Sequence, residues 1–308
     1  MRLLRQLDAR TSAAGSYVAA IGAFDGIHLG HRALIARVRD LAQRDGLASM
    51  VLSFEPLPKE FFAAADPPAR LTTFRERWRL LEQDGPDVFC VLRFNDALRS
   101  LPAAGFASLL VGGGVRTVVI GHDFRAGYKG EASAEWFTRN GPRFGLRVEV
   151  LGPVLSEGQR VGSGAIRAAL ATHQLDQAAR MLGRRYAMRG RVRAGERRGR
   201  AFGFPTANLR LGRRRTPLDG IFAVRVRGIA PGQALDGVAS LGTRPTVGGT
   251  EPLLEAHVFD YAGDLYGREL EVEFVARLRD ELRFDGVDAM VLQMQRDAAA
   301  ARALLATD

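Results

Sequence analysis

Two histidines lie three positions apart in the segment GAFDGIHLGH, which begins at Gly22 and ends at His31. The segment follows the apolar run Tyr17–Ile21 and opens a helical repeat of apolar residues. This position predicts that His28 and His31 lie on one face of a first helical turn, where free N–H groups and the positive end of the helix dipole also point. Gly30 lets a ligand approach the backbone closely. Such a turn suits a polyphosphate, because the imidazoles can donate to the charge that develops during displacement at phosphorus.

A second candidate phosphate site is the segment GFPTAN, which begins at Gly203 and ends at Asn208. Glycines such as Gly195 precede it and allow the backbone to wrap closely around phosphate oxygens. Pro205 favours an extended backbone here, so Thr206 and Asn208 are predicted to face the same side. A hydroxyl and an amide oxygen in that arrangement can hold Mg²⁺ beside phosphate oxygens. The same residues would also suit an ordinary Gly-Pro turn with polar caps.

The first half of the chain alternates strand-like and helix-like patterns. Strands are predicted at five apolar runs, Tyr17–Ile21 and residues 49–54, 87–92, 116–120 and 146–151. Helices are predicted over residues 33–41, 74–81 and 131–139. Strands that alternate with helices indicate an α/β domain with a parallel sheet covered on both faces. In such sheets, ligands bind where loops leave the carboxyl ends of the strands.

The second half changes to a pattern of strands. Residues 269–274 alternate strictly between acidic and apolar side chains, and residues 221–227 and 253–260 are also strand-like. Gly- and Pro-rich connectors separate these segments, which predicts a small antiparallel barrel or sandwich. An Ala-rich helix is predicted after them, over residues 287–305. Two short helical segments near residues 171–184 are expected to join the two halves.

Length and composition allow two globular domains. The chain has 308 residues, of which 46% are hydrophobic and 25% charged, a balance typical of a soluble globular protein. Its one cysteine, Cys90, excludes an intramolecular disulfide, and no apolar run approaches the roughly 18 residues of a membrane span. The start of the chain lacks the apolar stretch of a signal peptide. The expected location is the cytoplasm.

The chain carries a formal charge of +10, from 44 lysines and arginines against 34 acidic residues. Arginines cluster in several places, for example at Arg213, Arg214 and Arg215. Such a balance favours anionic partners, such as nucleic acid, phosphorylated small molecules or acidic membranes, and it also suits a solvated surface. No aromatic residues are regularly interleaved with the basic runs, so a stacking platform for single-stranded nucleic acid is not indicated.

The histidine segment resembles the signature of the HxGH nucleotidyltransferase superfamily, and its longer form GxFDGxHxGH is similar to the FAD synthetase branch. Further blocks fit the same family, at residues 54–58, 70–72, 121–125 and 161–167. The resemblance implies a Rossmann-like domain over residues 1–183 that transfers an adenylyl group from ATP to FMN and gives FAD. Its implied catalytic residues are His28 and His31. Its implied substrate and nucleotide contacts are Gly22, Phe24, Asp25, Gly30, Asp123, Arg125, Ser163 and Arg167, although Asp123 and Arg125 would equally suit a salt-bridged loop.

The sequence departs from this family's pattern at four positions. Ala23 replaces the usual Asn, and Ala126 replaces the usual Phe. Gly162 and Gly164 replace hydroxyl residues in the loop that holds the triphosphate in the family. Glycine still offers its backbone N–H, but the hydroxyl donors are missing. Arg167 is retained and can clamp phosphate oxygens, so adenylyl transfer is expected to work and to be the slower half.

The second half resembles riboflavin kinase over residues 184–308. The resemblance rests on GFPTAN and on residues 242–246 and 254–260, in the family's order and spacing. It implies an antiparallel β-barrel with a terminal helix, which phosphorylates riboflavin to FMN with ATP and Mg²⁺. Glu255 is implied as the general base that takes the proton from the ribityl hydroxyl, although a strand glutamate alone would also suit a plain surface position. The other implied contacts are Gly195, Gly203, Pro205, Thr206, Asn208, Arg279 and Phe284, with Mg²⁺ on Thr206 and Asn208.

Three functions remain open from the sequence. The leading prediction is a bifunctional enzyme that makes FMN and then FAD, with riboflavin, FMN and ATP as partners and no nucleic acid or membrane. The second is a riboflavin kinase whose first domain is weakened or only binds nucleotide, as the four departures suggest. The third is a non-catalytic flavin- or nucleic-acid-binding regulator, suggested by the basic charge. The intact residues Thr206, Asn208 and Glu255 argue against the third.

Overall fold

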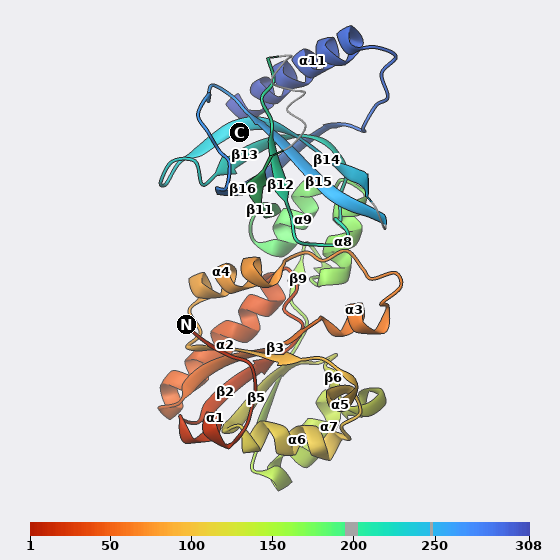
Figure 1. The fold of residues 1–308 in the computed structure, drawn as a ribbon. Helices are drawn as coiled ribbons and strands as arrows, with labels where there is room; N and C mark the ends of the chain where they lie inside the picture. The colour runs from red at the N-terminus through yellow and green to blue at the C-terminus, as the bar shows by residue number, and fades with distance from the viewer. Residues whose placement is uncertain (195–202, 247–248) are drawn as a thin grey trace. The chain divides into compact units, whose positions relative to one another are not determined.

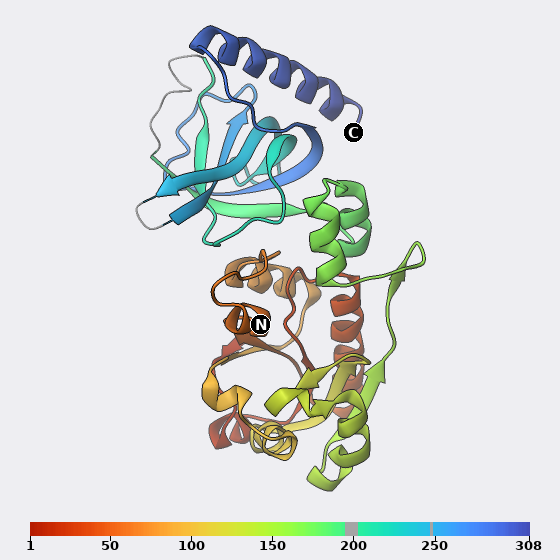
Figure 2. The ribbon, with the colours of Figure 1, turned by 90° about the vertical axis from the view of Figure 1, so that its right-hand side faces the viewer.

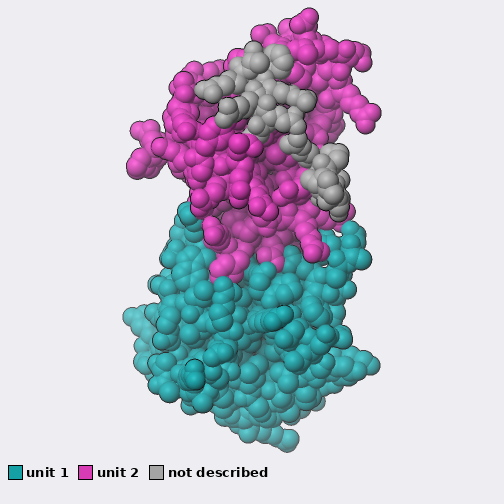
Figure 3. All heavy atoms as spheres, in the orientation of Figure 1, with its two compact units in different colours: residues 1–68, 77–162 teal, residues 69–76, 163–308 magenta. Residues whose placement is uncertain are grey.

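The computed structural model of the protein describes residues 1–194, 203–246 and 249–308. They form two compact units, which Figure 3 distinguishes by colour. Unit 1 comprises residues 1–68 and 77–162, and unit 2 comprises residues 69–76 and 163–308. These units are defined by contacts within the fold. The boundary predicted from the sequence, between residues 183 and 184, instead separates two activities, and it stays a prediction.

A six-stranded parallel sheet forms the centre of unit 1 (Figure 1). Its strands are β1 (Arg2–Leu4), β2 (Tyr17–Ile21), β3 (Ala48–Glu55), β4 (Val88–Arg93), β5 (Val115–Gly121) and β8 (Arg147–Leu151). Their order across the sheet is β1-β4-β3-β2-β5-β8. All five strands expected from the apolar runs are present, and β1 is an additional edge strand too short to show a pattern. The prediction of a parallel α/β domain is confirmed.

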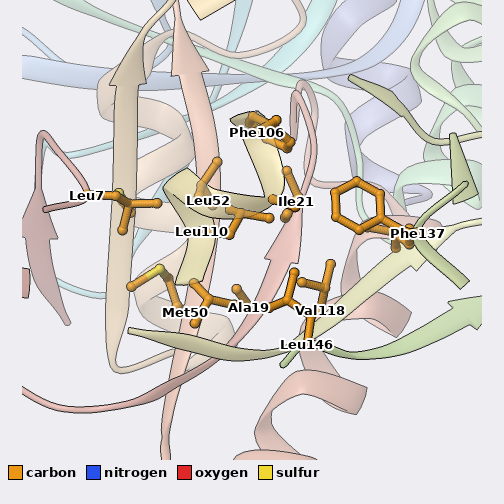
Figure 4. Close-up of a cluster of buried hydrophobic side chains, with 14 of the residues drawn as sticks. Leu7, Ala19, Ile21, Met50, Leu52, Phe106, Leu110, Val118, Phe137 and Leu146 are labelled. Atoms are coloured by element: carbon orange, nitrogen blue, oxygen red, sulfur yellow. The ribbon is translucent and has the colours of Figure 1, made fainter. Parts of the chain in front are cut away.

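Helices cover both faces of this sheet. They are α1 (Ala9–Ala13), α2 (Leu29–Asp45), α3 (Pro58–Phe62), α4 (Phe74–Asp84), α5 (Asp96–Arg99), α6 (Ala103–Gly112) and α7 (Ala134–Asn140). On one face, α2 buries Val38 and Leu41. On the other face, Phe106 of α6 and Phe137 of α7 pack into a cluster with strand residues such as Ile21 (Figure 4). Periodicity does not predict α6, because its residues are nearly all apolar or small and give little contrast between two faces.

Short elements complete unit 1. Two hairpins pair β6 (Arg125–Ala126) with β7 (Ala132–Ser133) and β9 (Leu155–Ser156) with β10 (Gln159–Arg160). Two 3-10 turns are η1 (Tyr128–Gly130) and η2 (Gly141–Phe144).

The strand order sets the position of a ligand site beside β2. This strand has β3 on one side and β5 on the other. The loops that leave β2 and β5 therefore diverge at the carboxyl edge of the sheet, and open α/β sheets bind ligands in the crevice at such a point. The loop after β2 carries His28, and the loop after β5 carries Asp123. The sheet thus brings two distant segments of the sequence to one edge.

A closed antiparallel barrel forms the centre of unit 2 (Figures 1 and 2). Two helices precede it, α8 (Ser163–Ala171) and α9 (Leu175–Leu182). Its strands are β11 (Ala187–Arg193), β12 (Ala207–Arg210), β13 (Gly220–Arg227), β14 (Ala234–Thr246), β15 (Gly249–Val258) and β16 (Glu269–Arg279), in the closed order β11-β12-β15-β14-β13-β16. The barrel prediction is confirmed, and the sandwich alternative is wrong. Helix α11 (Val287–Ala306) packs Ala301 and Leu305 against the outside of the barrel.

A buried ion pair holds residues 69–76 in unit 2. Arg213 has no exposed side-chain surface and donates two hydrogen bonds to the Glu76 carboxylate, at 2.7 and 2.6 Å. Glu76 also accepts from the backbone N–H of Arg189 at 2.7 Å. The expectation that the arginine cluster faces solvent or an anionic partner is therefore wrong for Arg213.

Among the described residues, no helix is both long and apolar enough to cross a membrane.

Candidate active sites

The loop between β2 and α2 holds both histidines of the first motif. His28 is the N-cap of α2 and not a residue of its first turn, so the sequence prediction is wrong in this detail. The backbone N–H of His31 donates to His28 Nδ1 at 3.3 Å, and the two rings stack with centroids 3.6 Å apart. A Cβ at Gly30 would lie 3.2 Å from the His28 ring, so this packing favours glycine. His28 and His31, called the histidine pair below, thus form one group at a helix N-terminus.

Backbone strain marks the same loop. Phe24 and Ile27 adopt left-handed φ angles of 51° and 41°, which residues with a Cβ rarely do. Both side chains are fully buried, and Asp25 between them is also buried. Gly22 leaves room for the Phe24 ring, which would lie 3.3 Å from a Cβ there. Such backbone costs of order 1–3 kcal/mol per residue and is concentrated at functional sites.

The surroundings of His31 keep its ring neutral. Burial lowers the pKa of His31 well below its ordinary value of 6.5, and the nearby charges of His28 and Arg77 lower it further. Its Nδ1 is buried and has no hydrogen-bond partner in the part of the chain that the structure describes. The Phe24 ring lies against it, with the centroids 4.8 Å apart. A neutral imidazole donates through one nitrogen and accepts through the other, so His31 can donate to a phosphate without carrying a charge.

Arg77 of α4 contacts this loop and belongs to none of the sequence motifs. Its side chain is fully buried and donates to the Ala23 carbonyl at 3.0 Å and to Ser53 Oγ at 2.9 Å. It also forms an ion pair with Glu55. The only signal in the sequence is that Arg77 lies one helical turn before the buried Leu81, on a face where an apolar residue is expected.

The loop after β5 carries the candidates Asp123 and Arg125. Both residues are exposed. Asp123 forms an ion pair with Arg160 of β10, and Arg125 begins β6. Ala126 packs against the hydrophobic core of the sheet. The roles of Asp123 and Arg125 stay predictions, which their place at the carboxyl edge of the sheet supports.

The predicted triphosphate loop leads into α8. Gly162 ends unit 1, and Ser163 is the first residue of α8 in unit 2. Arg167 lies one turn further along this helix and donates from Nε to the Ala69 carbonyl at 2.6 Å. At Gly162 and Gly164, no atom outside the adjacent residues and the helix's own backbone lies within 4 Å of the place that a Cβ would take. The hydroxyl side chains of the family pattern would therefore fit at both positions.

Strand register brings together the residues of the second motif. The antiparallel strands β12 and β15 pair Asn208 directly with Glu255, and β14 pairs Ser240 with the same Glu255. Directly opposite residues point to the same face of a sheet. The neighbours of all three along their strands are buried in the barrel. Asn208, Glu255 and Ser240 therefore form one half-buried row on its outer face.

A cavity of about 340 Å³ lies beside this motif. Pro205 and Thr206 line it, together with buried strand residues and with Tyr261 and Tyr266. The ring nitrogen Nδ1 of His257 lies 2.9 Å from the Pro205 carbonyl oxygen and ties the motif to β15. Apolar and aromatic walls with a few polar groups suit a flat heterocycle. Of the predicted glycines, Gly203 is exposed, and Gly195 lies outside the described residues.

The predicted flavin-covering residues Arg279 and Phe284 lie at the end of β16 and after it. Arg279 forms an ion pair with the buried Asp297 of α11 through hydrogen bonds of 2.6–3.0 Å. Its guanidinium lies 5.9 Å from the centre of the Phe284 ring. Glu281, in the same segment, accepts a hydrogen bond from Ser240 at 3.1 Å. Arg279 thus fixes the segment to α11, and the contact of Arg279 and Phe284 with a flavin stays a prediction.

Two family models match the chain. The model described as FAD synthetase matches residues 10–165, and the model described as riboflavin kinase matches residues 182–305. The histidine pair lies in the first match. The GFPTAN segment and Glu255 lie in the second.

Similar proteins cover nearly the whole chain. A protein of Pseudomonas fluorescens named bifunctional riboflavin kinase/FMN adenylyltransferase is 42% identical over 309 residues, which cover 99% of this chain and 98% of that protein. A protein of the same name from Escherichia coli K12 is 40% identical and covers 92% of this chain and 91% of its own length. A solved structure described as a macrolide-efflux protein from Streptococcus pneumoniae has a TM-score of 0.82 and 30% identity, over 98% of this chain and 99% of that one.

The two family matches lie in one chain and follow each other in the order of the two motifs. This supports the bifunctional prediction over a kinase with a second domain that only binds nucleotide. The fold, the motifs and the full-length relatives agree, and the chain belongs to the bifunctional riboflavin kinase/FMN adenylyltransferase family.

Proposed function

We propose that this protein phosphorylates riboflavin to FMN at the barrel and adenylylates FMN to FAD at the loop of the histidine pair, with ATP as donor in both steps. The observation that carries the proposal is that one chain holds both site frameworks. These are the stacked histidine pair at the start of α2 and the Asn208–Glu255 pair across β12 and β15. FMN is then the product of one site and the substrate of the other. Location in the cytoplasm stays a prediction.

The direct test incubates the full chain with riboflavin, ATP and Mg²⁺ and resolves FMN and FAD by chromatography over time. FMN should appear first and FAD after it. If FMN accumulates with no FAD, only the kinase half of the proposal survives. If neither flavin forms, the proposal is wrong.

In adenylyl transfer, a phosphate oxygen of FMN attacks the α-phosphorus of ATP, and pyrophosphate leaves. A phosphate monoester is already largely ionised at neutral pH, so the attacking group needs no base. The site needs donors for the charge that builds on the phosphoryl oxygens. The histidine pair and backbone N–H groups at the start of α2 can supply such donors, and the helix dipole adds to them.

In the kinase step, the ribityl hydroxyl of riboflavin attacks the γ-phosphorus of ATP, and ADP leaves. This hydroxyl has to lose its proton, so a base within hydrogen-bond reach accelerates the step. Glu255 is a half-buried carboxylate held by strand register opposite Asn208. We assign Glu255 as this base.

Thr206 and Asn208 fit the Mg²⁺ that the kinase resemblance implies. Across residues 1–194, 203–246 and 249–308, no three His, Cys, Asp or Glu side chains are placed to hold a metal ion. An ion at Thr206 and Asn208 would take its other ligands from the nucleotide. A hydroxyl and an amide oxygen are hard donors of the kind that Mg²⁺ accepts beside phosphate oxygens. When bound, the ion would neutralise charge on the transferring phosphates.

Replacement of either histidine should separate the two steps. We expect His28→Ala and His31→Ala each to slow FMN adenylylation by about 10²-fold, because a donor to the developing charge is lost. Riboflavin phosphorylation by the same preparation should be unchanged, since Glu255 and its barrel are untouched. The measurement is the rate of FAD formation from FMN beside the rate of FMN formation from riboflavin. Unchanged FAD formation in both variants would move the adenylyl site elsewhere.

Substitutions that restore the hydroxyl side chains of the family pattern should accelerate adenylyl transfer, which we expect to be the slower of the two reactions. Each hydrogen bond to a charged phosphate is worth about 1.5–3 kcal/mol, so Gly162→Ser and Gly164→Thr, singly and together, should raise the rate about tenfold or more. Both positions have room for the side chain. The matched control is Gly112→Ser, at an equally open position at the end of α6. If the wild type makes FAD as fast as FMN, the departures are neutral and this expectation fails.

A further inference from the structure

We propose that Arg77 is a positioning residue for adenylyl transfer, which holds the carbonyl of Ala23 and thereby fixes the loop that carries the histidine pair. The inference rests on the adenylyltransferase function proposed for this loop. It assigns a role within that function to a residue of α4 that no motif includes.

Arg77 reaches the loop with its whole side chain buried. One guanidinium nitrogen, Nη1, donates to the Ala23 carbonyl at 3.0 Å and to Ser53 Oγ at 2.9 Å. The Ser53 hydroxyl donates to the same carbonyl, also at 3.0 Å. The other nitrogen, Nη2, is fixed by the ion pair with Glu55. A carbonyl that accepts two hydrogen bonds, one of them from a cation, has little freedom to turn.

The held carbonyl stands directly before the strained part of the loop. The next residue, Phe24, has a left-handed φ, as has Ile27 further on. The side chain of Ala23 is exposed, so the main chain and not the side chain anchors this position. If the carbonyl were released, the Ala23–Phe24 peptide could turn and Phe24 could relax toward ordinary backbone. His28, which caps α2 directly after this stretch, would then move from its place.

Arg77 also acts on the pKa of His31. The groups that set the charge around His31 are His28 in the same loop and Arg77 from α4, and the charge of Arg77 is itself paired with Glu55 of β3. A nearby cation makes protonation of an imidazole more costly, so the charge of Arg77 lowers the pKa of His31. Loss of that charge should therefore raise the pKa of His31. A residue that only filled space would not produce this shift.

The test uses three variants of the full chain. Arg77→Met removes the donors and the charge. The double variant Arg77→Met/Glu55→Gln also removes the carboxylate that would otherwise be left without its partner, which protects folding. Arg77→Lys keeps the charge but lacks the planar fork that spans several acceptors. The matched control is Arg75→Met, at an exposed position of the same helix.

We expect Arg77→Met and the double variant to lower kcat for FMN adenylylation about 10- to 100-fold, because small displacements of catalytic groups have effects of this size. KM should change less, and Arg77→Lys should recover part of the loss. Riboflavin phosphorylation should stay at the wild-type rate in all variants, and Arg75→Met should alter neither step. Folding is checked by circular dichroism, and the double variant decides the question if Arg77→Met does not fold.

The second readout is the titration of His31, followed by NMR of histidine-labelled protein, which is practical because the chain has five histidines. The pKa of His31 should rise in Arg77→Met and stay near that of the wild type in Arg77→Lys. If the folded Met variants make FAD at the wild-type rate, or if His31 titrates in Arg77→Met as in the wild type, the proposal is wrong. A wild type that forms no FAD would refute the proposed function itself, which is a separate outcome.

Discussion

Glu255→Gln is expected to remove most riboflavin phosphorylation and to leave FMN adenylylation intact. Glutamine keeps the shape and the half-buried place opposite Asn208, but it cannot accept the proton of the attacking hydroxyl. Loss of a general base slows a reaction by about 10²–10⁴-fold. The loss should appear in kcat and in kcat/KM to the same degree, because proton transfer occurs only in the transition state. The measurement is FMN formation from riboflavin at saturating ATP.

The matched control is Glu251→Gln on the same strand. Glu251 is exposed and forms an ion pair with the equally exposed Arg210 at 3.6 Å. Exposed pairs of this kind contribute little, so this variant should phosphorylate riboflavin like the wild type. If Glu255→Gln does so as well, another group takes the proton. Glu255 is then not the general base, whereas the barrel can still be the place of riboflavin phosphorylation.

Arg213→Met is expected to destabilise unit 2 by about 3–5 kcal/mol, a factor of roughly 10²–10⁴ in its unfolding equilibrium. The substitution leaves the Glu76 carboxylate buried without its cation, although Arg189 still donates a backbone N–H to it. An uncompensated buried charge is far more costly than the pair itself. The measurement is the midpoint of urea unfolding, followed by circular dichroism. Hydrogen exchange of residues 69–76 should accelerate, because this segment is the part held by the pair.

Two further variants test the cause of this loss. Arg214→Met changes the exposed neighbour of Arg213 and should alter stability by less than about 0.5 kcal/mol. The double variant Arg213→Met/Glu76→Gln should recover much of the loss, because glutamine is neutral and still accepts the N–H of Arg189. Equal stability of Arg213→Met and Arg214→Met would contradict a structural role for the buried pair.

The sequence alone determined the elements that repeat and the residues that stand in motifs. Apolar runs predicted five of the six strands of the parallel sheet, and strict alternation over residues 269–274 predicted the inward and outward faces of β16. Both features depend on local periodicity, which the chain displays directly. The histidine pair and the GFPTAN segment could be found for a related reason, because their residues lie within a few positions of one another.

The sequence could not separate buried charges from solvated ones. Arg213 and Arg214 are neighbours of the same type, yet the first is buried on Glu76 and the second is exposed. Arg77 likewise differs in sequence from the exposed Arg75 only in its place one helical turn before Leu81. Whether an arginine is buried depends on a carboxylate or carbonyl that the fold brings to it from elsewhere in the chain, so no local pattern reports it.

The tertiary structure alone decided which distant residues share a site. The sheet order places the loop after β5 beside the loop after β2, and barrel register sets Asn208 directly opposite Glu255, with Ser240 on the far side. A shift of one residue between β12 and β15 would turn Glu255 away from Asn208 and leave every motif unchanged in sequence. Motifs identify the groups that can do chemistry, but strand pairing sets the distances between these groups. Closure of the barrel fixes the pairing of all six strands together.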